Sequence, residues 1–123
     1  MREMKSTSYR DLEVWKRAIR LAKTVYELTE DFPTREIYGL GNQLRRSAVS
    51  VAANIAEGQA RTSYKEFKYF LGISLGSLAE LETLLTIAVE TRYISEDCRK
   101  EVIPMTDEIT RMLKGLLKHI RRL

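Results

Sequence analysis

Apolar residues recur at helical spacing in four long segments of this chain, and no segment alternates apolar and polar residues over the length of a strand. The pattern predicts helices over residues 9–31, 41–57, 63–92 and 95–123. Because the residue before a proline avoids helical dihedral angles, Phe32-Pro33 should end the first helix. Pro104 lies inside the fourth segment, so it should kink that helix or mark its true start. We therefore expect an all-α protein with short connections.

The first predicted helix has a wide apolar face. With residues placed about 100° apart around the axis, its apolar arc spans about 200°, whereas a simple surface helix needs about 100°. The additional width of the apolar arc is explained either by a wide side that faces the core or by a surface that contacts another chain. The sequence leaves both explanations open.

Small residues are prominent in the next two helices. Ala48, Ala52 and Ala56 recur every four residues in the second helix, and Gly72 and Gly76 have the same spacing in the third. Each glycine should cost about 1 kcal/mol relative to alanine in an exposed helix. We expect close packing of the glycines against the groove of alanines to compensate for this cost.

Three signals mark helix ends. Gly58 is a plausible end of the second helix, because glycine is common just past a C-terminus. Ser63 and Glu66 have the spacing of a capping box at the start of the third helix. Ser95 can cap the fourth helix.

Polar residues form a strip beside the alanine groove. Its members are Arg45, Arg46, Ser50, Asn54 and Glu57, with Glu80 and Glu82 of the third helix as candidate partners of the arginines. Buried polar groups need partners, so we interpret these residues as a structural network that fixes helix register and subunit packing. The alternative is a polar site for a phosphate or a partner. Acid–base or metal chemistry by Glu57, Glu80 and Glu82 is a further alternative, but no histidine or metal-ligand spacing supports it.

The chain has one histidine, His119, and one cysteine, Cys98, which excludes most familiar catalytic sites. Serine or cysteine hydrolases would have to use His119, and zinc or di-iron sites need clusters of ligands that are missing. We therefore expect no enzymatic activity, no cofactor and no metal. The lone cysteine, the lack of an apolar span of about 18 residues and the polar N-terminus favour a cytoplasmic protein that does not bind membranes. At this length we expect one domain over residues 1–123, with residues 1–8 flexible.

The net charge of +4 is concentrated at the C-terminal end. Residues 111–123 contain five cations and no acid, which leaves −1 for the rest of the chain. Arg111, Lys114, Lys118, Arg121 and Arg122 fall within about 100° of one another around the fourth helix. Such a strip can neutralise phosphates without reading bases, and the lack of an aromatic residue among them gives no indication of base stacking there. The alternative is a solvated face that complements the negative end of the helix.

Two sequence blocks suggest a family. The first is residues 43–58, which ends in Asn54-Ile55-Ala56-Glu57-Gly58, and the second is residues 67–85, which includes Gly76-Ser77-Leu78-Ala79-Glu80-Leu81-Glu82. Together with Leu12-Glu13-Val14-Trp15 and Phe32-Pro33, they resemble the bacterial four-helix-bundle family of intervening-sequence proteins. Those proteins are named for reading frames inside insertions in large-subunit rRNA genes. The resemblance covers residues 9–123.

The resemblance implies an antiparallel up-and-down four-helix bundle that assembles into a barrel-like homopentamer. It also implies distant kinship in fold to the accessory protein of diversity-generating retroelements, a basic pentamer that binds a reverse transcriptase and nucleic acid. Five copies of a +4 chain would carry +20. We therefore expect a non-catalytic homo-oligomer that binds nucleic acid, with RNA or an RNA–protein complex as the first expectation, through its basic strip. DNA and a nucleic-acid-processing protein are the other candidate partners. The alternative is a protein-interaction scaffold without a nucleic-acid role.

Overall fold

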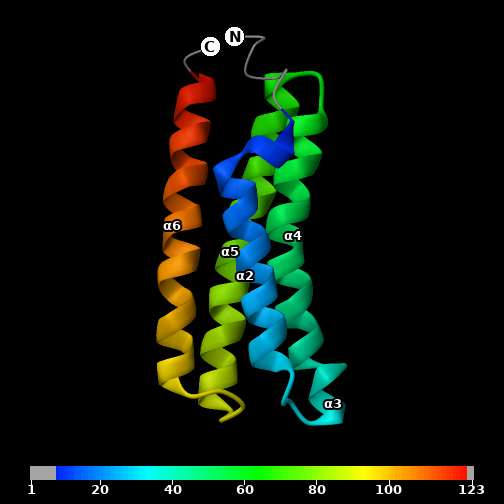
Figure 1. Ribbon diagram of the computed structural model, residues 1–123, viewed down its shortest axis with the longest axis vertical. Helices are drawn as coiled ribbons and strands as arrows, with labels where there is room; N and C mark the ends of the chain where they lie inside the picture. Colours follow the sequence, from blue (N-terminus) through cyan, green and yellow to red (C-terminus); the bar gives the residue numbers. More distant parts are fainter. Residues whose placement is uncertain (1–7, 122–123) are drawn as a thin grey trace.

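The computed structural model describes residues 8–121, which form four long helices in an antiparallel up-and-down bundle (Figure 1). The long helices are α2, Glu13–Thr29; α4, Leu40–Ala60; α5, Tyr64–Glu90; and α6, Glu96–Arg121. The shorter elements are the 3-10 helix η1, Tyr9–Asp11, and the one-turn helix α3, Thr34–Ile37. Each long helix packs against its neighbours in sequence, and α6 closes the bundle against α2. No strand occurs among residues 8–121, so the expected all-α bundle is confirmed.

Helix α5 supplies much of the core. Phe67, Leu71, Leu81 and Leu85 are fully buried, and together they extend over most of the length of the helix. Burying one such side chain stabilises a protein by about 1.5–3 kcal/mol. The buried side chains of the other three helices pack around this row, so one continuous core runs through the bundle.

Two helix starts follow the sequence signals, whereas the first predicted helix starts later than expected. Ser63 Oγ accepts a hydrogen bond from the Glu66 backbone N–H at 3.2 Å, and Ser95 Oγ accepts one from the Cys98 N–H at 3.1 Å. Both predicted caps are therefore confirmed.

Residues 9–11 form the 3-10 helix η1, Leu12 is extended, and α2 begins at Glu13. Flexibility was predicted for residues 1–8, of which residues 1–7 lie outside the described residues. Ser8 caps η1, with its Oγ accepting a hydrogen bond from the Arg10 N–H at 3.2 Å.

The predictions for helix ends need correction at three positions. Helix α2 ends at Thr29, before Phe32-Pro33; Phe32 is buried, and Pro33 precedes α3. Gly58 does not end a helix, because α4 continues to Ala60. Of the two alternatives for Pro104, the start of a helix is wrong, because α6 begins at Glu96 and continues through Pro104 (Figure 1). Pro104 is exposed, so water can reach the backbone carbonyl that loses its helical partner there.

Gly58 instead lets α4 and α5 approach each other. A Cβ atom on Gly58 would lie 2.9 Å from Phe70 Cβ and 3.0 Å from Phe67 Cδ1. Real Cβ atoms do not come this close to other heavy atoms, so only a glycine fits without a shift of the two aromatic side chains. Gly58 is therefore the glycine that permits a close contact between these two helices.

The prediction of close packing by Gly72 and Gly76 was wrong. Both glycines are exposed, and a Cβ atom on either would meet nothing within 4 Å. Ala48 and Ala52 of the expected groove are buried, and Ala56 is half-buried. The uncharged stretch around the glycines suggested burial on all sides, but one side of α5 faces solvent.

Helix α5 ends at the lower end of the bundle in Figure 1 with a residue in a left-handed conformation. Arg92 has φ of 68°, and the Tyr93 N–H donates to the Ala88 carbonyl at 2.8 Å. The turn holds Tyr93 with its ring stacked on Phe32, 5.5 Å between centroids, and with its hydroxyl donating to Glu36 Oε2 at 3.1 Å. This contact ties the α5–α6 connection to the connection between α2 and α4.

One described helix, α5, is long and apolar enough to cross a membrane by length and composition. In the bundle, 39% of its most apolar 18-residue window is buried. The central helix of a helical bundle has the same composition, so this feature is weak evidence for a membrane span.

Candidate nucleic-acid interface

The C-terminal cations lie on the solvent side of α6. Arg111, Lys114, Lys118 and Arg121, which we call the basic strip, are all exposed. No hydrogen bond or ion pair within residues 8–121 involves any of the four side chains. The fifth predicted member, Arg122, lies outside the described residues. The basic strip is therefore four charges that are free to meet a phosphate.

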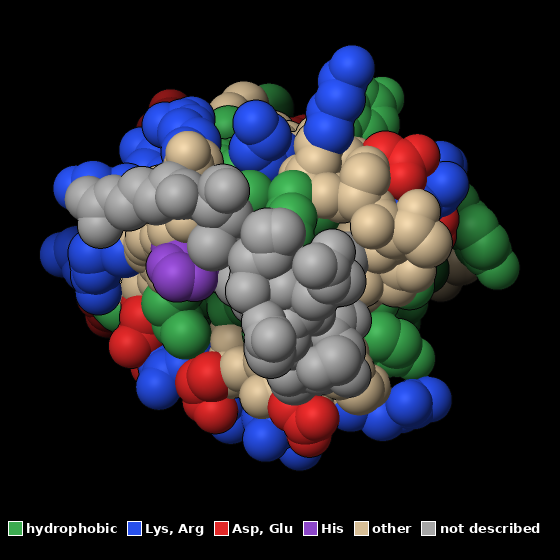
Figure 2. All heavy atoms as spheres, turned by 90° about the horizontal axis from the view of Figure 1, so that it is seen from above, with side chains coloured by type: hydrophobic (Ala, Val, Ile, Leu, Met, Phe, Trp, Pro, Cys, Tyr) green, Lys and Arg blue, Asp and Glu red, His purple; other side chains and the backbone are tan. Residues whose placement is uncertain are grey.

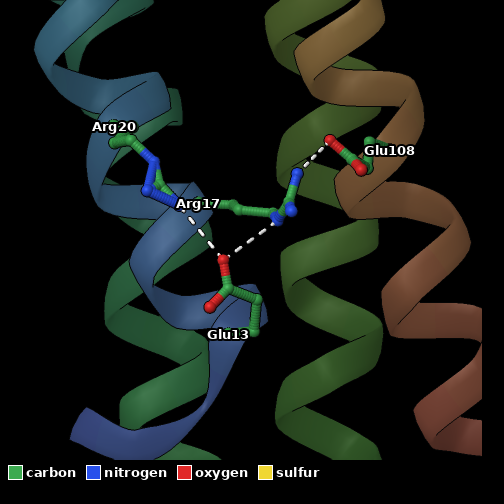
Figure 3. A network of polar contacts seen from close by, with 4 residues as sticks. All are labelled: Glu13, Arg17, Arg20 and Glu108. Atoms are coloured by element: carbon green, nitrogen blue, oxygen red, sulfur yellow. Dashed lines mark hydrogen bonds and ion pairs between the residues drawn. The ribbon is translucent and has the colours of Figure 1, made fainter.

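Two arginines on the neighbouring surface of α2 are paired instead (Figure 3). Arg17 Nε lies 3.2 Å from Glu13 Oε2, and the same guanidinium pairs with Glu108 of α6. Arg20 donates a hydrogen bond to Glu13 Oε2 at 3.1 Å. This bond lowers the pKa of Glu13 from its ordinary value near 4.5, and the charge of Arg17 acts in the same direction. Arg17 and Arg20 are therefore already partly neutralised, unlike the basic strip.

The structure adds two lysines of α5 to the basic strip. The Thr106 hydroxyl donates to Glu82 Oε2 at 2.7 Å and so fixes the register of α6 against α5. Lys68 precedes Glu82 by fourteen residues, and Ile120 follows Thr106 by the same number. Because both helices rise by about 1.5 Å per residue in opposite directions, Lys68 lies level with the end of the basic strip. Lys65 lies about one turn nearer the N-terminus of α5.

Lys68 also lies on the side of α5 that faces α6. Around the helix axis it falls within about 40° of Glu82, which contacts α6 directly. Lys65 and Lys68 are exposed and have no ion pair with any residue in the range 8–121. Viewed along the bundle from its upper end, blue Lys and Arg side chains occupy the left side, where Figure 1 places α6, and continue around the upper edge (Figure 2). The helical pattern of α6 could not reveal these two lysines, because they lie on another helix and far from the basic strip in the sequence.

The predicted polar network divides into separate contacts. Arg45 does not pair with an acid: its Nε donates to Thr29 Oγ1 at 2.7 Å, and its guanidinium lies 4.6 Å above the Tyr26 ring. Glu57 pairs at 2.6 Å with Arg61, the residue that follows the last residue of α4. Arg45 therefore fixes α4 against α2. The ion pair of Glu57 is local and connects α4 to no other helix.

Serine hydroxyl groups make hydrogen bonds between α4 and α5. Ser50 Oγ and Ser77 Oγ are 2.8 Å apart, and Asn54 Nδ2 donates to Ser50 Oγ at 2.9 Å. One turn away, the buried Ser74 donates to the Val51 carbonyl at 2.9 Å. The bond of Ser50 therefore joins α4 to α5, whereas Asn54 bonds only to Ser50 within α4. The structural interpretation of these two residues stays a prediction.

The expected pairing of the arginines with Glu80 or Glu82 is absent from the described residues. Glu82 accepts from Thr106, on the side of α5 that faces α6. Glu80 lies on the other side, where it lines a groove of about 380 Å³ with Arg46 and Ser50. Within residues 8–121, no ion pair joins Arg46 to Glu80. The carboxylates of Glu57, Glu80 and Glu82 therefore do not converge on one site. No three His, Cys, Asp or Glu side chains in the described part of the chain are grouped so as to hold a metal ion.

Comparison with known proteins establishes the family. Residues 10–115 match the profile of the 23S rRNA-intervening sequence protein family. The chain belongs to this family. Its fold is similar to the crystal structure of a protein of unknown function from the S23 ribosomal protein family of Bacteroides thetaiotaomicron, with a TM-score of 0.76 and 24% identity. That match covers 85% of this chain and 98% of the other. No curated protein matches the sequence.

In this member of the 23S rRNA-intervening sequence family, one apolar face is left open. Ile19 and Tyr26 of α2 are 44% and 47% exposed, and Val49 of α4 is 44% exposed. Tyr26 and Val49 also line a groove of about 380 Å³ between the two helices, together with Arg46. Part of the wide apolar arc of the first predicted helix is therefore not used by the core of a single chain.

Proposed function

We propose that this protein binds nucleic acid through phosphate contacts made by the basic strip, without catalysing a reaction. The observation that carries the proposal is the set of four exposed, unpaired cations on α6, which Lys65 and Lys68 extend onto α5. Phosphate contacts of this kind supply most of non-specific affinity for nucleic acids. The link of the family to rRNA intervening sequences favours RNA as the ligand.

We further propose that the protein acts as a homo-oligomer, with five copies as the expected number. The exposed apolar residues Ile19, Tyr26 and Val49 supply a surface that a second copy would cover. A pentamer would carry five basic strips, and linked sites raise affinity without any new contact. Light scattering should give a mass near five times 14.3 kDa. A monomer at all concentrations would contradict this part of the proposal.

A salt-dependent mobility shift with a short RNA tests the binding. Because each phosphate contact contributes about 0.7–0.9 to the slope of log affinity against log salt, Lys114→Gln with Lys118→Gln should lower the slope by about 1.4–1.8 per strip. The matched control is Lys16→Gln with Lys23→Gln, which removes the same charge from exposed positions of α2. Absence of binding at low salt, or equal losses in both double variants, would refute the proposal.

A second candidate function is a protein-interaction scaffold, which the open α2–α4 face favours. A partner protein would then cover Ile19 and Val49, and nucleic acid would play no part. A pull-down from nuclease-treated cell extract separates the two functions. Partners that survive nuclease treatment and are lost in Ile19→Asp favour the scaffold, whereas partners that disappear with the nuclease favour the nucleic-acid proposal.

A further inference from the structure

An exposed aromatic side chain lies beside the basic end of the bundle. Tyr69 of α5 is 65% exposed. It lies next to Lys68 in the sequence and one helical turn from Lys65, so the three residues share the upper part of the same helix. Going around α5 from the side that faces α6, Lys68 comes first, then Lys65, then Tyr69. The two lysines therefore bridge the distance between the basic strip and the Tyr69 ring.

The Tyr69 ring is held in place by its neighbour. Its centroid lies 5.2 Å from that of Phe70, with the two rings nearly perpendicular at 82°. Phe70 itself packs under the Arg61 guanidinium, 4.9 Å from the ring centroid. Much of the Tyr69 side chain remains open to solvent beside this edge-to-face contact, because it is 65% exposed. A large, oriented aromatic ring next to cations has the features of a platform for base stacking.

Other exposed tyrosines lack this combination. Tyr38 is 81% exposed, but it follows α3 at the opposite end of the bundle (Figure 1). Tyr26 is 47% exposed, but the Arg45 guanidinium already covers its ring. Among the described tyrosines, Tyr69 is thus the one that is exposed, in contact with a second ring and close to the free lysines of α5.

We propose that Tyr69 stacks on an unpaired base and that the interface is therefore specific for single-stranded nucleic acid over duplex. This inference rests on the proposed function, because the basic strip has to hold the phosphates on either side of the stacked base. In a duplex the bases are already stacked on one another, so only the phosphate contacts would remain. RNA and DNA strands share the chemistry of stacking and phosphate contact, and the test distinguishes them.

The test measures the affinity of the full chain for one mixed-sequence oligonucleotide as single-stranded RNA, single-stranded DNA and blunt RNA duplex. Tyr69→Ala should weaken binding to the single strands by about 5- to 150-fold, the value of one stacked base, and should leave duplex affinity unchanged. Tyr69→Phe keeps the ring and should bind as the wild type. Tyr38→Ala is the matched control, and it should also bind as the wild type. A 2-aminopurine in the strand should be quenched by the wild type and less by Tyr69→Ala.

The outcomes separate the two proposals. If Tyr69→Ala binds single strands as tightly as the wild type while Lys114→Gln with Lys118→Gln weakens binding, the stacking role is refuted and the phosphate interface stands. Equal losses on single strands and duplex in Tyr69→Ala would also refute stacking, because they would report a general change of the surface. If the wild type binds none of the three probes at low salt, both proposals are wrong. A preference of the wild type for the RNA strand over the DNA strand would identify RNA as the ligand.

Discussion

Replacing Gly72 and Gly76 by alanine should stabilise the protein. Both glycines lie inside α5, where they increase the freedom of the unfolded chain and weaken the helix relative to alanine. A new Cβ atom at either position would meet nothing within 4 Å, so the substitution creates no clash. The gain in helix propensity is therefore not offset by strain in the folded chain.

The size of the effect follows from helix propensity and chain length. Each Gly→Ala change in an exposed helix interior contributes about 0.4–1 kcal/mol, so the pair should raise the free energy of unfolding by about 1–2 kcal/mol. At about 2.1 cal/mol/K per residue, a 123-residue chain has an unfolding entropy of about 0.26 kcal/mol/K. The double variant should therefore melt about 4–8 °C above the wild type.

Circular dichroism melts at several protein concentrations measure this shift, with urea titrations as a second measurement. Gly58→Ala is the matched control, because its Cβ atom would lie 2.9 Å from Phe70 Cβ and should lower the melting temperature. A lower melting temperature in the Gly72→Ala, Gly76→Ala variant would refute the reasoning. It would mean that another copy of the chain covers this side of α5 in the assembled protein.

Three other substitutions test the polar contacts. Thr106→Val removes the hydroxyl that donates to Glu82 and should cost about 1–3 kcal/mol in urea unfolding, because a half-buried carboxylate loses its partner. Ser50→Ala with Asn54→Ala should cost about 1 kcal/mol per lost bond, and unchanged melting and assembly would refute their structural role. Because pairing lowers the pKa of Glu13, its contribution to stability is present above about pH 4.5 and is lost as the pH falls through the lower folded value. Glu13→Gln should therefore weaken the acid dependence of the melting temperature below that pH.

The fold could be predicted from the sequence because helical periodicity and capping chemistry are local. Ser63 and Ser95 mark true helix starts, since the capping hydrogen bond joins residues three apart in the chain. The errors came from tertiary contacts. The composition around Gly58 suggests a helix end, but its role is to make room for Phe67 and Phe70, which lie on the next helix, α5. Gly72 and Gly76 read as buried because their neighbours are uncharged, although a helix can be uncharged on a side that faces solvent.

Only part of the candidate site could be predicted from the sequence, because the rest depends on tertiary contacts. The basic strip is a local pattern on one helix, and the structure keeps all four of its described members exposed. Lys65 and Lys68 lie at the same end of the bundle as the basic strip only because α5 and α6 are antiparallel and are held in register by the bond between Thr106 and Glu82. Periodicity assigns a residue to a side of its own helix, but it does not say which other helix that side meets.

The basic strip could bind phosphates, or it could only stabilise the negative C-terminal end of α6. The positions of its cations along α6 allow these two roles to be distinguished. Cations stabilise the negative end of a helix only within its last turn, by about 0.3–1 kcal/mol each. Lys118 and Arg121 lie in the last turn of α6, whereas Arg111 and Lys114 do not. If the strip served the helix alone, Arg111→Gln with Lys114→Gln would change neither stability nor binding.

If the basic strip binds phosphates, substitutions at both ends of the strip should lower the affinity for RNA. Arg111→Gln with Lys114→Gln should keep the melting temperature and lose affinity for RNA. Lys118→Gln with Arg121→Gln should lose affinity together with a small part of the stability. Melting curves and mobility shifts on both double variants would measure this. If affinity changed only in the pair that also loses stability, the effect would come from the helix end, and the basic strip would not be a binding surface.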